Sequence, residues 1–466
     1  MDLVTTVADR AARRLVRWEQ QTPDALPPGP LAPPKAQMFS FLLTPGPFLR
    51  ACRERFGKVV TIRIPGIPPI VQFSEPDAVR EVFAASDETV HAGEANAVLE
   101  PFLGSYSVLI LDGPRHRSQR RLLLPPFRGD RMRAYGEAMR DITEAAVAKW
   151  PRAPGGGERF VLQRETQAIT LDVILRTVFG MEDGADQDRM RALLVRGLRI
   201  LDNPVFLVRT FQKDLGPLSP WGRFLRLREA GFREMDALVA RRRREGFGDD
   251  ILSMLLQATH EDGTPMSDAE IHDELLTLLV AGHETTATGL TWALHDLSTH
   301  PQVLRRVQEE LDARLGGGPI DPDKVRELPY LDAVCKETLR IHPVIPGIGR
   351  VLQKPTRIGG IDLPAGVAVG CSIYLVHSDP DTWPDPERYD PTRFLDKKPS
   401  PYTYFPFGGG MRRCIGEAFA LYEMRIVLAT ILQKLEPVAA VKHVREQRRN
   451  ITLTPAGGLP IRMQPR

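Results

Sequence analysis

The segment from Phe407 to Gly416 reads FGGGMRRCIG and leads into a stretch with apolar residues at helical spacing. Its three consecutive glycines allow the backbone to turn tightly and to approach a planar ligand closely. The helix that we expect from about Ile415 points its N-terminus at Cys414, and the helix dipole and loop N–H groups favour a thiolate there. Most lone cysteines only fill space in a core, but this setting indicates a cysteine that binds a ligand.

The composition of the 466-residue chain is that of a globular protein with a large core. Hydrophobic residues make up 42% and charged residues 26% of it, which excludes a disordered or collagen-like chain. Lys and Arg number 62 against 59 Asp and Glu, and the resulting charge of +3 gives no support for nucleic-acid binding. Four widely separated cysteines argue against a disulfide framework or a zinc site and favour a reducing, cytoplasmic location.

Residues 1–48 are expected to form an N-terminal segment that is first amphipathic and then proline-rich. Its first part has apolar residues at helical spacing with arginines among them, at Leu3, Val7, Ala11, Leu15, Arg10, Arg13, Arg14 and Arg17. Such a helix can lie on a membrane surface, or it can be a short terminal helix docked on the protein. Eight prolines between residues 23 and 47 predict an extended, helix-free stretch. No apolar run reaches 18 residues and no signal-peptide pattern occurs, so we expect neither a transmembrane helix nor a signal peptide.

Residues 49–466 are expected to form one domain that is mainly α with a smaller β part (α+β). Residues 58–64 and 70–73 are rich in β-branched side chains and flank Pro65-Gly66, which predicts a strand pair. From about residue 76 to residue 345 the apolar spacing is helical, and short strands, prolines and loops follow.

One helix is predicted to be long enough to cross the molecule. Ser267 and Glu270 form a capping box, and apolar residues continue to Leu297, a length of about 50 Å. Its apolar middle nevertheless contains poor helix formers and ionisable groups, at Gly282, His283, Glu284, Thr285 and Thr286. Residues that disfavour a buried helix, when they occur at its centre, indicate a functional or strained site.

Taken together, these segments resemble the cytochromes P450 of the soluble bacterial type. FGGGMRRCIG matches the haem-ligand loop of that family, F-x-x-G-x-R-x-C-x-G, at every defined position. AGHETT at residues 281–286 matches its long-helix motif, and KETLR and PTRF supply a glutamate and two arginines. HRSQR supplies a histidine and an arginine that in the family reach haem propionates. The resemblance implies the cytochrome P450 fold and a haem-thiolate monooxygenase.

The resemblance also assigns roles to individual residues. It implies haem b as cofactor, with Cys414 as the axial thiolate ligand to the metal, and O2 as co-substrate. The implied cofactor-binding residues are His116, Arg120, Ala281, Arg350, Phe407, Arg412, Cys414 and Gly416. Thr285 and Glu284 are implied to deliver protons to iron-bound dioxygen, for which Gly282 would open the helix. Glu337 and Arg340 share one helix face and are expected to form a structural triad with Arg393.

The implied substrate is a hydrophobic small molecule, because family correspondence places mainly aliphatic segments over the haem (residues 94–103, 200–206, 280–281, 344–348 and the turn near 454–455). The expected pocket residues are Leu99, Phe102, Leu103, Leu201, Val280, Val344, Ile345 and Ile348. Terpenoid, fatty-acid and steroid-like molecules all fit this description.

Electrons are expected to come from NAD(P)H through a separate ferredoxin or flavodoxin-type protein with its reductase, because the chain has no Rossmann fingerprint or ferredoxin cysteine run. The arginines that could form a basic docking patch for it, or simply a solvated face, are Arg117, Arg120, Arg121, Arg412 and Arg413. We expect a monomer.

Two other functions remain open from the sequence. A peroxygenase or isomerase of the same fold commonly lacks the acid-threonine pair, which this chain has at Glu284 and Thr285. A haem-based sensor or carrier would need no proton relay and usually has an output domain, of which the sequence gives no sign.

Overall fold

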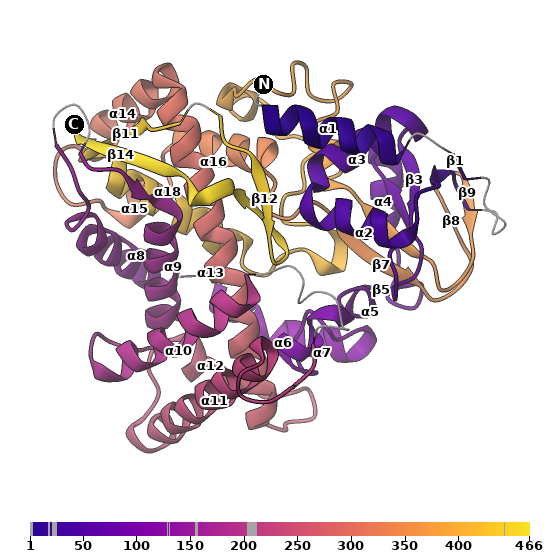
Figure 1. Cartoon of the computed structure of the whole chain (residues 1–466). Helices are drawn as coiled ribbons and strands as arrows, with labels where there is room; N and C mark the ends of the chain where they lie inside the picture. Colours follow the sequence, from indigo (N-terminus) through magenta and orange to yellow (C-terminus); the bar gives the residue numbers. More distant parts are fainter. Residues whose placement is uncertain are drawn as a thin grey trace.

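The long central helix α13 (Asp268–Thr299) organises the structure, a computed structural model that describes residues 3–16, 19–20, 26–127, 129, 131–153, 157–202, 212–441 and 443–466. Ser267 and Glu270 form the predicted capping box at its start. It runs through the middle of the molecule and packs against α9 (Leu162–Thr177), α16 (Pro329–Ile341) and α18 (Glu417–Leu432) (Figure 1). The predicted long helix is therefore confirmed.

The remaining helices cover α13 on both sides. On one side lie the N-terminal helices and the largest sheet, and on the other lie α8, α9, α14 and α15 (Figure 1). Their bounds are α1 Leu3–Leu15, α2 Pro34–Leu43, α3 Pro45–Phe56, α4 Pro76–Ala84, α5 Ala92–Ala95, α6 Glu100–Leu103, α7 Gly113–Leu123, α8 Arg131–Val147, α10 Ala185–Leu201, α11 Pro220–Glu245, α12 Ile251–Gln257, α14 Pro301–Leu315, α15 Pro322–Val325 and α17 Ile373–His377.

The β part is smaller than the helical part, as predicted. Its largest sheet has the order β3-β4-β10-β7-β5, in which only the β4–β10 pairing is parallel. β3 (Val59–Ile62) and β4 (Ile70–Phe73) are the predicted strand pair. The other strands of this sheet are β5 Val90–His91, β7 Ile348–Leu352 and β10 Ala368–Cys371.

Four smaller sheets complete the β part. β11 (Leu435–Ala439), β14 (Pro460–Pro465) and β6 (Phe160–Val161) form one, and β12 (Glu446–Arg449) and β13 (Thr452–Pro455) form a hairpin. The two remaining pairs are β1 Glu19–Gln20 with β2 Gly29–Pro30, and β8 Thr356–Ile358 with β9 Ile361–Leu363.

Two expectations about local structure were wrong. Residues 34–47 of the stretch that was expected to be extended are mostly helical, because they contain α2 and the start of α3. Pro34 and Pro45 begin these helices, where proline has the right φ and its missing N–H costs nothing. The expected boundary between residues 48 and 49 consequently falls inside α3.

Helix α1 is docked on the protein through its apolar face. Ala12 and Val16 are buried in a cluster with residues of α3, and Arg13 pairs with Glu54 of α3. This contact favours the docked helix over the membrane-surface alternative. Within the described ranges, no helix combines the length and the hydropathy that crossing a membrane requires.

Candidate active site

The glycine-rich loop is closed by a hydrogen bond from the Cys414 N–H to the Phe407 carbonyl, with 2.9 Å between N and O. Gly408 and Gly410 have φ of 68° and 64°, which few other residues adopt. A Cβ atom at Gly409 would overlap the ring of Phe83, and one at Gly410 would overlap its carbonyl oxygen. The glycines thus let the loop lie against the end of α4, before Gly416 starts α18.

Cys414 is the exposed cysteine of the chain, whereas Cys52, Cys335 and Cys371 are buried. Protein atoms still surround it closely enough that desolvation raises the pKa of its thiol, although the Gly416 N–H acts in the opposite direction. The Gly416 N–H therefore favours the thiolate, in the direction expected of the loop N–H groups, but desolvation of the thiol outweighs it. An enclosed but accessible thiol is suited to metal binding, because coordination itself removes the proton.

Basic side chains converge on this loop from three elements. His116 of α7 is 3% exposed, and burial together with Arg412 and Arg120 lowers its pKa to about 3. Burial also lowers the pKa of Arg412 to about 10, with Asp112 opposing this and Arg350 and Arg120 adding to it. Positively charged side chains that lie together in a buried place require nearby anions that compensate their charge. The two carboxylates of haem would meet this requirement, so the residues fit that group.

Asp112 is a residue of this cluster that sequence analysis missed. Its carboxylate accepts the N–H groups of Ala92, Gly93 and Glu94, each at 2.9 Å, and it pairs with Arg412. It ties the segment around α5 to the glycine-rich loop. In the sequence it looks like an ordinary N-cap of α7, whereas its side chain makes no capping hydrogen bond.

The centre of α13 remains regularly helical. The Thr285 hydroxyl donates to the Ala281 carbonyl one turn earlier, at 2.5 Å. A Cβ atom at Gly282 would lie 2.9 Å from the Cδ1 atom of Ile174 in α9, so this glycine allows α9 and α13 to pack closely. The structure thus gives Gly282 a packing role and not the expected opening of the helix.

Glu284 points toward α9 and the β12–β13 hairpin. Gln167 donates to its carboxylate at 2.6 Å and Gln163 at 3.4 Å, and Arg449 lies 3.8 Å away. Burial raises the pKa of Glu284 to about 7, although Arg449 lowers it. A carboxyl that titrates near neutrality can both accept and release a proton.

His283 is a satisfied core histidine. Its Nδ1 lies 3.0 Å from the hydroxyl of Thr170, and burial lowers its pKa to about 3.

Glu337, Arg340 and Arg393 lie together, with both arginines close to the Glu337 carboxylate. Arg340 donates from Nε and Nη2 to the two carboxylate oxygens of Glu337, at 2.7 and 2.8 Å, and both side chains are fully buried. Nε of Arg393 lies 3.4 Å from Glu337 Oε1. The Asp390 N–H also donates to Glu337 at 2.9 Å.

The expected pocket residues fall into separate groups. Phe102 and Leu103 form an apolar cluster with Trp221 and Phe224, and the partly buried residues packed against it include Leu99, Ile200 and Val280. A small apolar cavity between α10, α11 and α13 is lined by Phe102 and Val280.

The pocket residues that follow α16 lie closer to the glycine-rich loop or to the hairpin. Ile348 approaches Gly408, Val344 is buried and accepts the Leu453 N–H at 2.8 Å, and Ile345 is half-buried. The side chain of Leu201 and residues 203–206 lie outside the described part of the chain.

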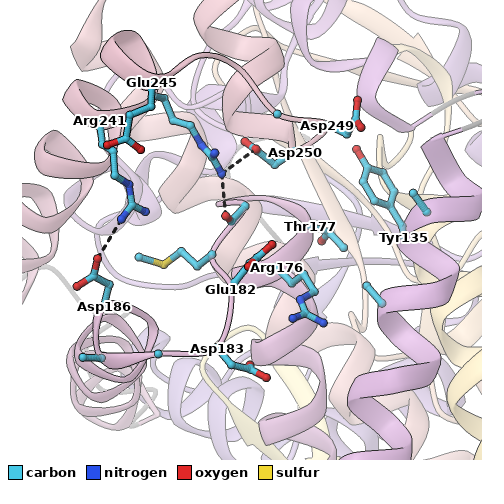
Figure 2. A pocket seen from close by; sticks show the side chains of 18 residues that line it. Tyr135, Arg176, Thr177, Glu182, Asp183, Asp186, Arg241, Glu245, Asp249 and Asp250 are labelled. Atoms are coloured by element: carbon cyan, nitrogen blue, oxygen red, sulfur yellow. Dashed lines mark hydrogen bonds and ion pairs between the residues drawn. The ribbon is translucent and has the colours of Figure 1, made fainter.

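Another pocket, between α8, α9, α10 and α11, has a volume of about 760 Å³ and contains no predicted site residue. Along its wall Arg241 pairs with Asp186 at 3.0 Å (Figure 2). Arg242 pairs with Asp250, also at 3.0 Å. Its polar lining differs from the apolar cluster around Phe102.

The arginines expected on a docking surface have acidic partners. Arg117 pairs with Asp87, Arg121 with Glu261 and Arg413 with Glu417. Arg412 and Arg120 belong to the cluster around His116. The local positive charge is largely compensated, which favours a solvated face over a strongly basic patch.

The sequence profile of cytochrome P450 matches residues 27–459. The chain belongs to the cytochrome P450 family. A Mycobacterium tuberculosis protein provisionally named cytochrome P450 135B1 is 39% identical over 443 residues, which cover 94% of this chain and 91% of that protein. One provisionally named cytochrome P450 138, from the same species, is 37% identical and covers 95% and 97% of the two chains.

Two solved P450 structures have the same fold. The retinoic acid-bound cyanobacterial CYP120A1 aligns with a TM-score of 0.81 and 25% identity, over 92% of this chain and 96% of that chain. The haem domain of cytochrome P450DA aligns with a TM-score of 0.77 and 25% identity, over 94% of each chain. This P450 is accordingly a monooxygenase of a family that uses haem with a cysteine thiolate, consumes O2 and generally receives electrons from redox partners.

Proposed function

We propose that this P450 binds haem b through Cys414 and inserts one oxygen atom from O2 into a hydrophobic small molecule. The observation that best supports the assignment is the position of Cys414, enclosed but accessible, beside a buried cluster of His116, Arg120, Arg350 and Arg412. Bound haem would supply O2 activation, and its thiolate ligand favours O–O cleavage. The haem domain would consist of residues 49–466 together with the rest of α3, and α1 is docked on it.

The residues of the site would divide the binding task between them. Arg350 and Arg412 would pair with propionates together with Arg120, and the neutral His116 would donate a hydrogen bond to one of them. Phe407, Gly416 and Ala281 would contact the macrocycle. Glu337, Arg340 and Arg393 would hold the loop in place without touching it.

Thr285 and Glu284 would move protons into the site. The Thr285 hydroxyl now donates within its own helix, and rotation about χ1 would redirect it toward a bound water. Glu284 would be the proton donor, because its pKa of about 7 lets both protonation states be populated near neutral pH. The presence of both residues favours a monooxygenase over a peroxygenase or an isomerase.

The substrate would be terpenoid, fatty-acid or steroid-like. The aliphatic and aromatic side chains around Phe102 support a hydrophobic ligand, and retinoic acid in CYP120A1 is an isoprenoid of this kind. Electrons would come from NAD(P)H through a separate ferredoxin or flavodoxin and its reductase. All four cysteines are free, which is consistent with a cytoplasmic location, and we propose a monomer.

Reconstituted turnover tests this proposal. A panel of hydrophobic molecules is first scored by the spin shift of the ferric protein, and the best binder is then incubated with NADPH, ferredoxin and reductase. Oxygenated product that requires all three supports a monooxygenase. Product formed equally well with hydrogen peroxide alone, by wild type and by Thr285→Ala, would instead identify a peroxygenase.

A further inference from the structure

Arg449 lies between two carboxylates that belong to distant parts of the chain. Its Nε and Nη2 donate to the two carboxylate oxygens of Asp202, at 2.6 and 2.5 Å. Its Nη1 lies 3.8 Å from Oε1 of Glu284. The side chains of Arg449 and Glu284 are 22% and 16% exposed, so solvent screens this contact only partly. The guanidinium of Arg449 therefore contacts the carboxylates of Asp202 and Glu284 at the same time.

The backbone that presents Arg449 is firmly held. Arg449 is the last residue of β12, it faces Thr452 across the hairpin, and its carbonyl accepts the Thr452 hydroxyl at 2.8 Å. The hairpin is attached to α13 by the Trp292 indole N–H, which donates to the Leu453 carbonyl at 3.1 Å. These contacts hold the Arg449 backbone close to α13, the helix that carries Glu284.

Asp202 is the partner that α10 connects to the apolar cluster around Phe102. It directly follows α10, whose residue Ile200 packs against the cluster of Phe102, Leu103, Trp221 and Phe224. A ligand that displaces this cluster would move the end of α10 and with it Asp202. The bidentate contact between Asp202 and Arg449 would transmit that movement to the vicinity of Glu284.

The groups that face Glu284 come from three elements. α9 contributes Gln163 and Gln167, β12 contributes Arg449, and the end of α10 contributes Asp202. After burial, Arg449 has the largest effect on the pKa of Glu284 and lowers it, whereas Asp202 raises it. Arg449 is thus the positive group that favours the ionised form of Glu284, and Asp202 competes for Arg449.

We propose that Arg449 is a positioning residue for proton delivery, and that by bridging Asp202 and Glu284 it links the substrate-facing end of α10 to the protonation state of Glu284. The link rests on the proposed function of Glu284 as the proton donor. Arg449 itself need not touch substrate or cofactor, because it acts through Glu284.

Infrared titration of the full-length haem protein tests the link without turnover. The carboxylic-acid C=O band that Glu284→Gln removes is followed against pH. We expect Arg449→Gln to raise the midpoint of this band by about one pH unit or more, because a close opposite charge lowers a carboxyl pKa by roughly that amount. Arg449→Lys should restore most of the wild-type midpoint, and Asp202→Asn should lower the midpoint.

Arg448→Gln is the matched control, since Arg448 precedes Arg449 on the same strand and lies over the ring of Phe41 instead. It should leave the midpoint unchanged even if it lowers the melting temperature. Unchanged midpoints in Arg449→Gln and Asp202→Asn would overturn the link. If Arg449→Gln does not fold, the Lys variant and Asp202→Asn decide the question by the same criterion.

The pH profile of coupled turnover separates this link from the proposed function. A parallel shift of the infrared midpoint and of the turnover profile supports both the link through Arg449 and the proposed role of Glu284 as proton donor. A shift of the midpoint without a shift of turnover would retain the electrostatic bridge but reject Glu284 as proton donor, and with it the role of Arg449 in delivery.

Discussion

Arg340 donates from Nη1 to the main-chain carbonyl of His377, with 2.9 Å between the atoms. The ring Nε2 of the same histidine accepts the N–H of Phe405 at 3.0 Å. Burial lowers the pKa of His377 to about 3, so this nitrogen is free to accept. A single residue thus connects the buried Glu337–Arg340 pair to the segment that enters the glycine-rich loop.

Arg340→Ala is expected to destabilise the protein by roughly 3–5 kcal/mol, because it leaves Glu337 charged, buried and without its main partner. Denaturant unfolding of the haem protein measures the loss, together with the yield of folded protein. Arg357→Ala is the control, since the Arg357–Asp362 pair is exposed and such pairs contribute ~0–1 kcal/mol. Wild-type stability in Arg340→Ala would show that the buried pair is dispensable.

Stability is expected to fall between about pH 6.5 and pH 9 because of His342. Burial lowers the pKa of this histidine, but Asp296 and Glu446 outweigh burial and raise it to about 9. The imidazole also stacks on Trp292, with 3.9 Å between ring centroids. The folded state holds the His342 proton more tightly than the unfolded state does. The contribution of this histidine to the free energy of unfolding is therefore complete below the ordinary pKa near 6.5, and it is lost as pH rises toward 9.

The contribution of His342 amounts to roughly 3 kcal/mol at 1.36 kcal/mol per pH unit. His342→Gln should therefore flatten the free energy of unfolding over this pH range, and His443→Gln, at an exposed histidine, should not. If the free energy of unfolding of His342→Gln still falls over this pH range as in the wild type, another group causes the fall.

Thr285→Ala is expected to uncouple NAD(P)H consumption from product formation. Product per NAD(P)H should fall severalfold and peroxide should rise, because the hydroxyl that holds the proton-delivering water is lost. Haem content and substrate spin shift should stay close to wild type. Thr288→Ala, which removes a buried hydroxyl without a hydrogen-bond partner, is the control. Equal coupling in both variants would leave Thr285 only a role in helix structure.

Turnover is expected to require a separate electron donor and to depend only modestly on salt. Because the arginines near the loop have acidic partners, raising ionic strength should slow reduction by an acidic ferredoxin roughly two- to fivefold. Glu417→Gln, which frees Arg413, should speed reduction at low salt, whereas Glu229→Gln on α11 should not. NADPH-driven turnover by the purified chain alone would reject an external donor.

The sequence predicted the elements whose signals are local. The capping box at Ser267 and the apolar spacing that follows predicted α13 nearly to the residue. The same local reasoning failed for α2 and α3, because prolines that break a helix interior also begin helices. Element type was thus easier to predict than the meaning of individual prolines.

The parts of the site that sequence analysis missed are long-range contacts of ordinary residues. Arg412 and Asp112 are 300 positions apart, and Arg449 and Asp202 are 247 apart. Neither aspartate belongs to a motif, and an arginine at the end of a hairpin resembles a solvated charge. Such partners emerge only when the fold brings the strands and helices together.

The reduced carbon monoxide difference spectrum tests most directly whether Cys414 is the thiolate ligand of haem. The wild-type protein is predicted to have the long-wavelength Soret band of a thiolate-ligated haem, and Cys414→His is predicted to bind haem but to lose that band. Cys371→Ser, at a buried cysteine, should keep it. A long-wavelength band that persists in Cys414→His, or one that is absent from the wild type, would contradict the account.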